Sequence, residues 1–233
     1  MEMDCQAFED ILAQYVSRNI IKNICCLKLE VKKAGGGYSV DILNTSNNQN
    51  NLPKDPAVYL FLVSNEELAR FLGYSYITYN KFWRKCPDSK EQEENSLIFK
   101  KLERFIENQN FEKYQYYIPL YVGETDDFQR RYNQFKNTLS NNCNGNHVFG
   151  KNFCSYLKDI CQINSLRQYS MKMCLVVFYT DSEDKAQCIE SSILNHNDFC
   201  KIFNKNNSNC PNDEFEDIAN KIIDAIKNLQ SCP

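Results

Sequence analysis

The chain has 233 residues, of which 42% are hydrophobic and 24% charged, and a formal net charge of −3. This length allows one sizeable core or two small domains. The slightly acidic balance excludes a strong global attraction to nucleic acid but leaves room for a local basic groove. No apolar run approaches the ~18 residues that a membrane span needs, so we expect no membrane partner.

The 12 Cys residues bear on the compartment in which the protein works. No two have C-x-x-C spacing, several lie in apolar runs, and acidic residues stand where a secretory leader would be apolar. These features favour reduced thiols in an intracellular protein, cytoplasmic or, in a eukaryote, nuclear, over a disulfide framework. The nearest approach to a zinc cluster is a set whose spacing matches no common site: Cys143, His147, Cys154 and Cys161.

Residues 1–50 predict a lobe made of a helix and a β-hairpin. Apolar residues recur at helical spacing over 6–24. Residues 27–31 and 38–42 then alternate between apolar and polar, which predicts two strands with one buried face. The Gly35-Gly36-Gly37 triplet between them lacks the Lys-Ser/Thr and helix of a P-loop, so we interpret it as a hairpin turn. The lobe ends near residue 50, in an Asn-rich stretch.

Residues 57–63 form an uninterrupted apolar run, typical of a central strand covered on both faces. The stretch 64–115 then predicts an insertion with two helices around a Tyr- and Trp-rich segment. Basic residues interleave with its aromatics, a mixture that suits nucleic-acid contact as well as an ordinary solvated surface. The candidate DNA contacts of this insertion are Lys81, Arg84 and Lys85.

Residues 118–135 predict a strand, a turn and a helix. The β-prone run breaks at Gly123, and Thr125 or Asp126 is the candidate N-cap of the helix. A strand that brings Tyr and Gly to a helix carrying Arg is suited to holding a phosphate. The candidate substrate contacts of this stretch are Gly123, Thr125, Arg130 and Arg131.

A third strand is predicted over 171–180, and Asp181 or Ser182 is expected to cap the helix that follows. Glu190 lies beside the apolar stripe of that helix. A last amphipathic helix covers 215–229. The chain has only 2 His, one in a polar loop and one near a helix end, so a Ser-His or Cys-His nucleophile is poorly supported.

Three separated stretches together resemble the GIY-YIG nuclease family. Ala57-Val58-Tyr59 resembles the first motif, with Ala in place of Gly, and Tyr121-Val122-Gly123 resembles the second. Three further residues stand at family positions: Arg131, eight residues after the motif glycine, Glu190 in a later helix, and Asn204 beyond it. The resemblance covers residues 57–63, 117–139 and 171–206.

The resemblance implies an α+β fold with a three-stranded antiparallel sheet flanked by helices. The nuclease domain would span 51–210, preceded by the N-terminal lobe and followed by a C-terminal helix, 211–233, packed on the core. It also implies metal-dependent hydrolysis of phosphodiester bonds in DNA, most simply double-stranded. The N-terminal lobe or the insertion would supply DNA recognition and the contacts of a homodimer.

The resemblance also implies a role for each site residue. Glu190 would hold a single Mg²⁺ or Mn²⁺ ion, and Arg131 would clamp a non-bridging phosphate oxygen. Tyr59 would deprotonate the attacking water or assist in that step, for which a phenol needs positive charge nearby. Tyr121 would hydrogen-bond at the reacting centre, and Asn204 would orient the site.

Two positions depart from the family pattern. Phe135 stands where many members carry a His four residues after the Arg, and Glu124 stands directly after the motif glycine, where a basic or small residue is commoner. These departures keep a second function open, a catalytically silent module that binds nucleic acid or protein. A third interpretation is an unrelated α+β scaffold domain in which the motif match is chance.

Overall fold

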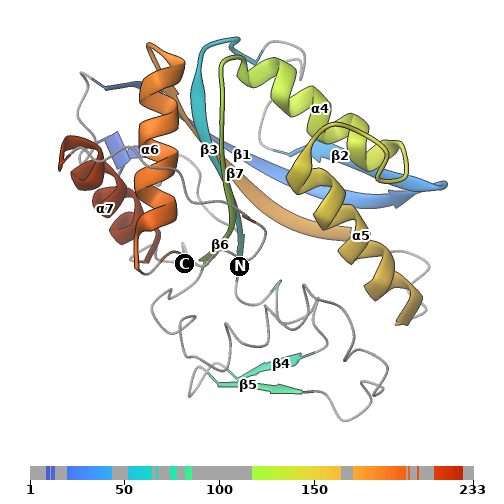
Figure 1. Cartoon of the computed structure of the whole chain (residues 1–233). Coiled ribbons are helices and arrows are strands. Elements are labelled where there is room, and N and C mark those ends of the chain that lie inside the picture. Colours follow the sequence, from blue (N-terminus) through green and yellow to red (C-terminus); the bar gives the residue numbers. More distant parts are fainter. Residues whose placement is uncertain are drawn as a thin grey trace.

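A computed structural model describes residues 9–10, 12–13, 20–43, 52–64, 67, 74–77, 82–85, 117–163, 170–197, 199, 204 and 213–227. These residues form an α+β fold in which one five-stranded antiparallel sheet is packed between helices (Figure 1). The strand order is β2-β1-β7-β3-β6. The strands are β1 (Ile21–Ala34), β2 (Gly37–Ile42), β3 (Ala57–Ser64), β6 (Tyr117–Thr125) and β7 (Ser170–Thr180).

The expected three-stranded sheet is therefore too small. The strands β6, β3 and β7 form the expected core, with β3 in the middle. The N-terminal hairpin adds two strands to it, because β1 pairs antiparallel with the outer edge of β7. Without the hairpin that edge would leave a long row of unpaired N–H and C=O groups.

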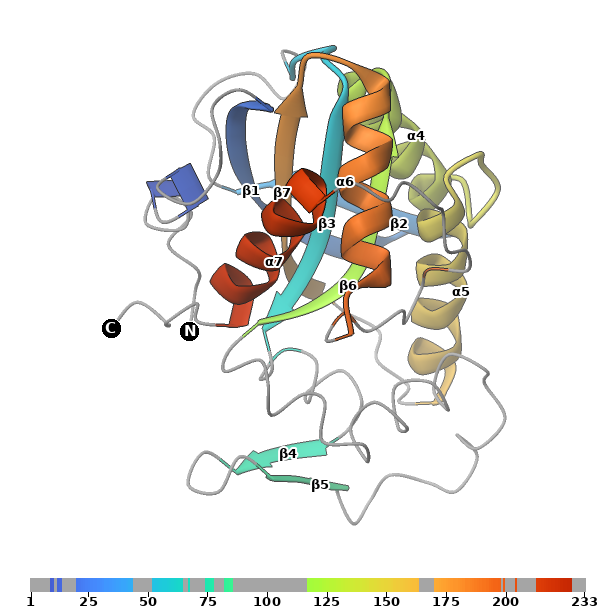
Figure 2. The same ribbon diagram turned by 60° about the vertical axis from the view of Figure 1, so that its left-hand side comes forward.

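Strand β3 confirms the prediction of a strand covered on both faces, because all of residues 57–63 are buried. The helices α4 (Phe128–Ser140) and α5 (Val148–Ile163) cover one face of the sheet, and α6 (Glu183–Asn195) and α7 (Asp213–Lys227) cover the other (Figure 2). Successive side chains of a strand point to opposite faces, so a strand between two helical layers needs apolar residues throughout.

The hairpin forms where it was predicted, with its turn at Gly35 and Gly36. Its first strand begins at Ile21, inside the stretch predicted as helix, and helical backbone is described only at 9–10 and 12–13. Gly37 lies against the end of α4, where an added Cβ would stand 2.3 Å from the carbonyl oxygen of Ser140. The absence of a side chain there lets the hairpin and α4 pack closely.

The helix α4 starts later than predicted, because its N-cap is Asp127 and neither Thr125 nor Asp126. The Asp127 carboxylate accepts the N–H of Arg130 at 2.9 Å. Thr125 is still a strand residue, paired with Ala57. Three helix predictions are confirmed in the apolar stripes of α4, α6 and α7, which are buried, and Ser182 caps α6.

In the predicted insertion, β4 (Tyr74–Ile77) and β5 (Phe82–Lys85) form a separate two-stranded antiparallel sheet. The two helices expected in the insertion lie outside the described residues, as does Lys81. Arg84 and Lys85 lie in β5, for which the structure describes the backbone only. None of the described helices is long and apolar enough to cross a membrane.

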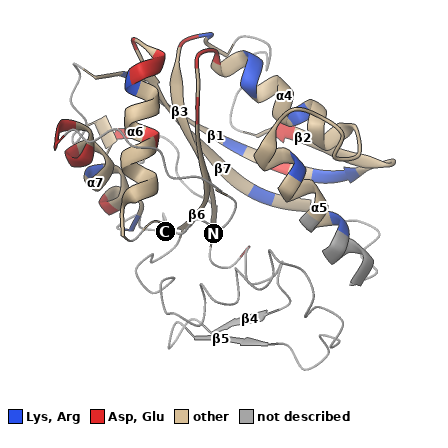
Figure 3. Ribbon diagram, in the orientation of Figure 1, with Lys and Arg blue, Asp and Glu red and all other residues tan. Residues whose placement is uncertain are grey.

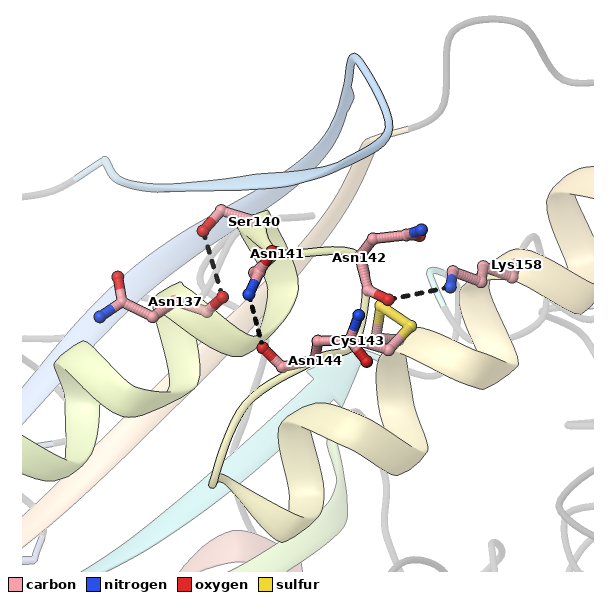
Figure 4. Close-up of a disulfide and its surroundings, with 8 residues drawn as sticks. Asn137, Ser140, Asn141, Asn142, Cys143, Asn144 and Lys158 are labelled. Atoms are coloured by element: carbon pink, nitrogen blue, oxygen red, sulfur yellow. Dashed lines mark hydrogen bonds between the residues drawn. A yellow bond between two sulfur atoms is a disulfide. The ribbon is translucent and has the colours of Figure 1, made fainter.

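Cys143 and Cys154 form a disulfide between the α4–α5 turn and α5, with Cα atoms 5.5 Å apart (Figure 4). Cys26 and Cys188 each also take part in a disulfide. The prediction of reduced thiols is therefore wrong for these four residues. Two members of the weak zinc candidate are covalently joined to each other, which removes them as metal ligands.

Removing the Cys143–Cys154 disulfide should lower the free energy of unfolding by about 3 kcal/mol, because the unfolded chain regains the freedom of a short closed loop. The double variant Cys143→Ala/Cys154→Ala and the wild type are compared by urea denaturation. A matched control is Cys25→Ala, which removes a thiol that is free. Equal unfolding midpoints for the double variant and the wild type would contradict the expectation.

Candidate active site

Tyr59 lies at the centre of the predicted site. It is placed by β3 opposite Gly123 of β6, and only 2% of it is exposed. Its phenolic oxygen accepts a hydrogen bond from Arg131 Nε at 3.1 Å, across from the first turn of α4. Burial and then the neighbouring Tyr121 raise the pKa of Tyr59 well above its usual value, against the charge and hydrogen bond of Arg131.

Gly123 makes room for both tyrosines of the two motifs. A Cβ at this position would lie 2.6 Å from the Cζ and Oη atoms of Tyr59 and 2.7 Å from Cε1 of Tyr121. The phenol of Tyr59 therefore lies directly over the glycine backbone. The glycine of the second motif is explained by this close approach, and needs no phosphate contact.

Gly123→Ala should lower the free energy of unfolding by about 1–3 kcal/mol, since the new methyl group overpacks two buried rings. It should also displace Tyr59 and reduce any activity that depends on it. Gly36→Ala is the matched control, because a Cβ there meets nothing within 4 Å. Urea denaturation of both variants checks the expectation, and equal stability of the two would show that the rings move aside freely.

Tyr121 lies on the edge strand β6, with its ring centroid 6.1 Å from that of Tyr59. Its ring stacks on Phe149 of α5 at 4.9 Å, which fixes its direction. Burial, followed by the negative charge of Glu190, raises the pKa of Tyr121, while Arg131 opposes the rise by charge and hydrogen bonding. Both tyrosines are therefore neutral phenols that share one guanidinium.

Glu190 projects from α6 and is partly buried. Burial and then the negative charge of Glu124 raise the pKa of Glu190 to about 7, against the opposing effect of Arg131. Burial also raises the pKa of Glu124, followed by the charge of Glu183. Two carboxyl groups are thus held in a setting where negative charge is poorly compensated.

The carboxylate oxygens of Glu190 and Glu124 are of the type that binds a hard divalent cation. The Oε2 atom of Glu124 is buried and has no hydrogen-bond partner within the described part of the chain. Mg²⁺ takes oxygen ligands and is commonly bound by one or two carboxylates with water and substrate phosphate completing the shell. Glu190, whose charge interacts with that of Glu124, is the candidate ligand. Across the described residues no group of three or more His, Cys, Asp or Glu side chains gathers.

The two arginines of α4 point to different places. Arg131 is directed to Tyr59 and to the Gln134 side chain, which accepts from Nη1 at 3.1 Å. Arg130 is exposed and forms an ion pair with Asp126. The Thr125 hydroxyl accepts the N–H of Asp127 at 3.1 Å, so it shapes the turn between strand and helix. Of the side chains of Thr125, Arg130 and Arg131, only that of Arg131 is directed to the tyrosines.

Asn204 uses its side-chain amide on the backbone of Val122. Its Oδ1 accepts the Val122 N–H at 3.1 Å, and its Nδ2 donates to the Val122 carbonyl at 2.7 Å. These two bonds imitate a strand partner on the open edge of β6. Asn204 therefore braces the strand between Tyr121 and Gly123, and it shapes the site through the backbone.

His147 was named from the sequence only as a member of the weak zinc candidate, and its place beside Tyr59 was not predicted. It is 1% exposed. Its Nε2 atom is 3.4 Å from the Tyr59 oxygen. Phe135, at the position where many family members carry a His, is fully buried and packs edge-on against the His147 ring at 5.4 Å. The imidazole thus reaches the tyrosine from the start of α5, a place that no spacing in the sequence connects to either motif.

No protein-family model matches the chain, and neither a search of curated proteins nor a search of solved structures found a match.

Proposed function

We propose that the protein is a metal-dependent DNA endonuclease of the GIY-YIG type. One observation carries the proposal: Tyr59, Tyr121 and Arg131, which come from three different elements, meet next to Gly123. Their close approach is possible only because Gly123 has no side chain. Glu190 adds a carboxylate that acts electrostatically on both phenols. Shifted pKa values of this kind, caused by burial and a specific charged neighbour, concentrate at functional sites.

The proposed chemistry assigns each side chain a separate task. Arg131, already next to both phenols, binds a non-bridging phosphate oxygen and stabilises the charge that develops on it. Tyr59 acts as the base in its phenolate form: it first releases its own proton to solvent and then accepts the proton of the attacking water, directly or through Tyr121. Because burial opposes ionisation of Tyr59, its proton transfer depends on positive charge close by, which Arg131 provides in part.

Glu190 would hold the cation, with Glu124 available as a second oxygen donor. When bound, Mg²⁺ or Mn²⁺ would polarise the phosphate and stabilise the leaving oxygen. The carboxylate of Glu190 itself also raises the pKa of Tyr121, so a positive charge bound there would ease the ionisation of the phenols.

The distribution of charge supports a polyanionic substrate on the side of the sheet that carries Arg131. The helices α4 and α5 have five basic side chains against one acidic one, whereas α6 and α7 have eight acidic against three basic. Figure 3 shows the corresponding division, with most blue segments on α4, α5 and the β1–β7 region and most red segments on α6 and α7. A DNA duplex would approach along α4 and α5, where phosphate contacts are favourable.

The expected intracellular location stays a prediction, and one finding opposes it. Disulfides such as Cys143–Cys154 persist mainly in oxidising compartments, in secreted or surface proteins. A nuclease with these cross-links would work most readily outside a reducing cytosol.

The function is tested by incubating the purified full chain with supercoiled plasmid in Mg²⁺, Mn²⁺, Ca²⁺ or EDTA. We expect nicked or linear product with Mg²⁺ or Mn²⁺ and none with EDTA. A gel-shift assay on the same samples separates the alternative function. Retarded DNA without cleavage under any metal would replace the nuclease by a catalytically silent binding module.

A further inference from the structure

His147 occupies the N-cap position of α5, and its ring is held by the backbone there. Its Nδ1 atom accepts the N–H of Gly150 at 3.1 Å, the third residue of the helix. The backbone N–H of His147 donates to the Thr138 hydroxyl at 3.3 Å. The bond at Nδ1 satisfies one of the backbone donors that every helix start leaves open.

This bond decides which nitrogen of the ring carries hydrogen. An Nδ1 atom that accepts a hydrogen bond has a lone pair and no proton, so the ring is neutral and its single N–H is at Nε2. Burial, followed by the positive charge of Arg131, lowers the pKa of His147 to about 3, in agreement with a neutral ring. His147 therefore faces Tyr59 with a donor and has no free lone pair with which to take a proton.

The phenolic oxygen of Tyr59 consequently lies between two N–H donors. Arg131 Nε is 3.1 Å away and His147 Nε2 is 3.4 Å away. A phenol accepts at most two hydrogen bonds on its oxygen, so the hydroxyl hydrogen of Tyr59 must point in a third direction. Hydrogen bonding between the two phenols, which lowers the pKa of Tyr121, is consistent with that direction.

We propose that His147 is a positioning residue: a neutral Nε2–H donor that, together with Arg131, hydrogen-bonds to two sides of the Tyr59 oxygen. The third position on that oxygen, which holds the hydroxyl hydrogen of the phenol and a free lone pair of the phenolate, then faces the reacting centre. The proposal rests on the proposed nuclease function for its purpose but not for its geometry. Helix α4 carries Phe135 at the position where many family members have a His. In this chain the imidazole comes instead from His147, at the start of α5.

The turn between α4 and α5 is built to hold this ring in place. Gly145 packs on Thr138, where an added Cβ would lie 2.1 Å from the hydroxyl oxygen. The Cys143 N–H donates to the Thr138 carbonyl at 3.0 Å, and the Cys143–Cys154 disulfide ties the turn to α5. Figure 4 shows two further bonds that close the turn, from Asn141 to the Asn144 carbonyl and from Lys158 to the Asn142 carbonyl, both 3.1 Å.

The hydrogen position is tested by NMR on full-length protein labelled with ¹⁵N-histidine. The chain has 2 His, and His196→Gln identifies the signals of His147. We expect one protonated and one unprotonated nitrogen between about pH 5 and pH 8, with the proton on Nε2. Tyr59→Phe should shift the Nε2–H signal and leave Nδ1 unchanged. A proton on Nδ1, or a charged ring at pH 6, would overturn the assignment even if the protein cleaves nothing.

Two variants separate the positioning role from the capping role by activity. His147→Asn keeps an oxygen that can cap Gly150 but offers nothing to Tyr59, so kcat should fall about tenfold with KM unchanged. His147→Gln loses the cap but can carry an amide N–H towards Tyr59. It should keep more activity than His147→Asn although it melts at a temperature about 2–4 °C lower than wild type.

The opposite order, with His147→Asn fully active and His147→Gln impaired, would leave His147 only the capping role and overturn the proposal. Equal losses in both variants would overturn it too. If the wild-type protein fails to cleave DNA with any metal, the proposed function falls, while the NMR experiment still decides where the hydrogen of His147 lies.

Discussion

Replacing Glu190 with Gln is expected to abolish DNA cleavage and at the same time to stabilise the metal-free protein above neutral pH. The loss of activity follows from the loss of the cation's ligand: metal-ion catalysis contributes several kcal/mol, which corresponds to a fall in rate on the order of 10³-fold. The substitution keeps the size and shape of the side chain, so the loss would not come from repacking.

The gain in stability follows from the raised pKa of Glu190. Its ordinary value is 4.5 and its value in the folded protein is about 7, so the folded state holds the proton more tightly than the unfolded chain. The stability that this proton supplies is fully present below pH 4.5 and is lost as the pH rises through 7. Each pKa unit corresponds to 1.36 kcal/mol, and after allowance for partial exposure the expected gain of Glu190→Gln at pH 8 is about 2 kcal/mol.

Urea denaturation of wild type and Glu190→Gln in EDTA, at pH 4.5 and pH 8, measures this gain. The curves should coincide at the lower pH and separate at the higher one. Added Mn²⁺ should stabilise the wild type at pH 8 but not the variant, since only the wild type binds it. Asp184→Asn is the activity control, because it removes an exposed carboxylate from the first turn of the same helix. Full activity in Glu190→Gln would refute the assignment of the metal ligand.

Tyr59→Phe is also expected to reduce cleavage strongly, by about 10²–10⁴-fold, the usual range for a group that moves a proton in the transition state. It should also lower stability by about 1 kcal/mol. The reason is that Arg131 Nε and His147 Nε2 both lose their acceptor in a buried place.

Tyr132→Phe is the matched control on α4. The Tyr132 hydroxyl is also buried, but no hydrogen-bond partner for it exists among the described residues. Removing it should leave cleavage unchanged and leave stability equal or slightly higher, because no partner is orphaned. Plasmid cleavage and urea denaturation of the two variants should thus differ in both readouts. Equal behaviour of Tyr59→Phe and Tyr132→Phe would show that Tyr59 is only a core residue.

The sheet core was predictable because its strands carry strong local patterns. The run 57–63 is apolar throughout, and residues 171–180 are nearly so, as strands between two helical layers must be. The N-terminal hairpin was also predicted, but its position in the sheet was not. Alternation of apolar and polar residues shows that one face of the hairpin is buried, and it does not show that β1 pairs with β7. The five-stranded sheet follows from an edge contact between distant parts of the chain.

The same limit applies to the site. Tyr59, Tyr121 and Arg131 were chosen by motif and spacing, and the structure brings them together. The place of His147 in the site was not predicted because its burial depends on the α4–α5 turn, which folds a polar loop back onto β3. The Cys143–Cys154 disulfide was missed for the same reason, since the turn brings two α-carbons to 5.5 Å without any recognisable sequence spacing.

The most direct test of the central claim is the initial rate at which the wild type and Glu190→Gln convert supercoiled plasmid to nicked or linear DNA in Mn²⁺, measured side by side. We expect conversion by the wild type that stops on adding EDTA, and a rate at least about 10³-fold lower for the variant. A wild type that leaves the plasmid intact, or equal cleavage rates of the two proteins, would contradict a metal-dependent nuclease that uses Glu190.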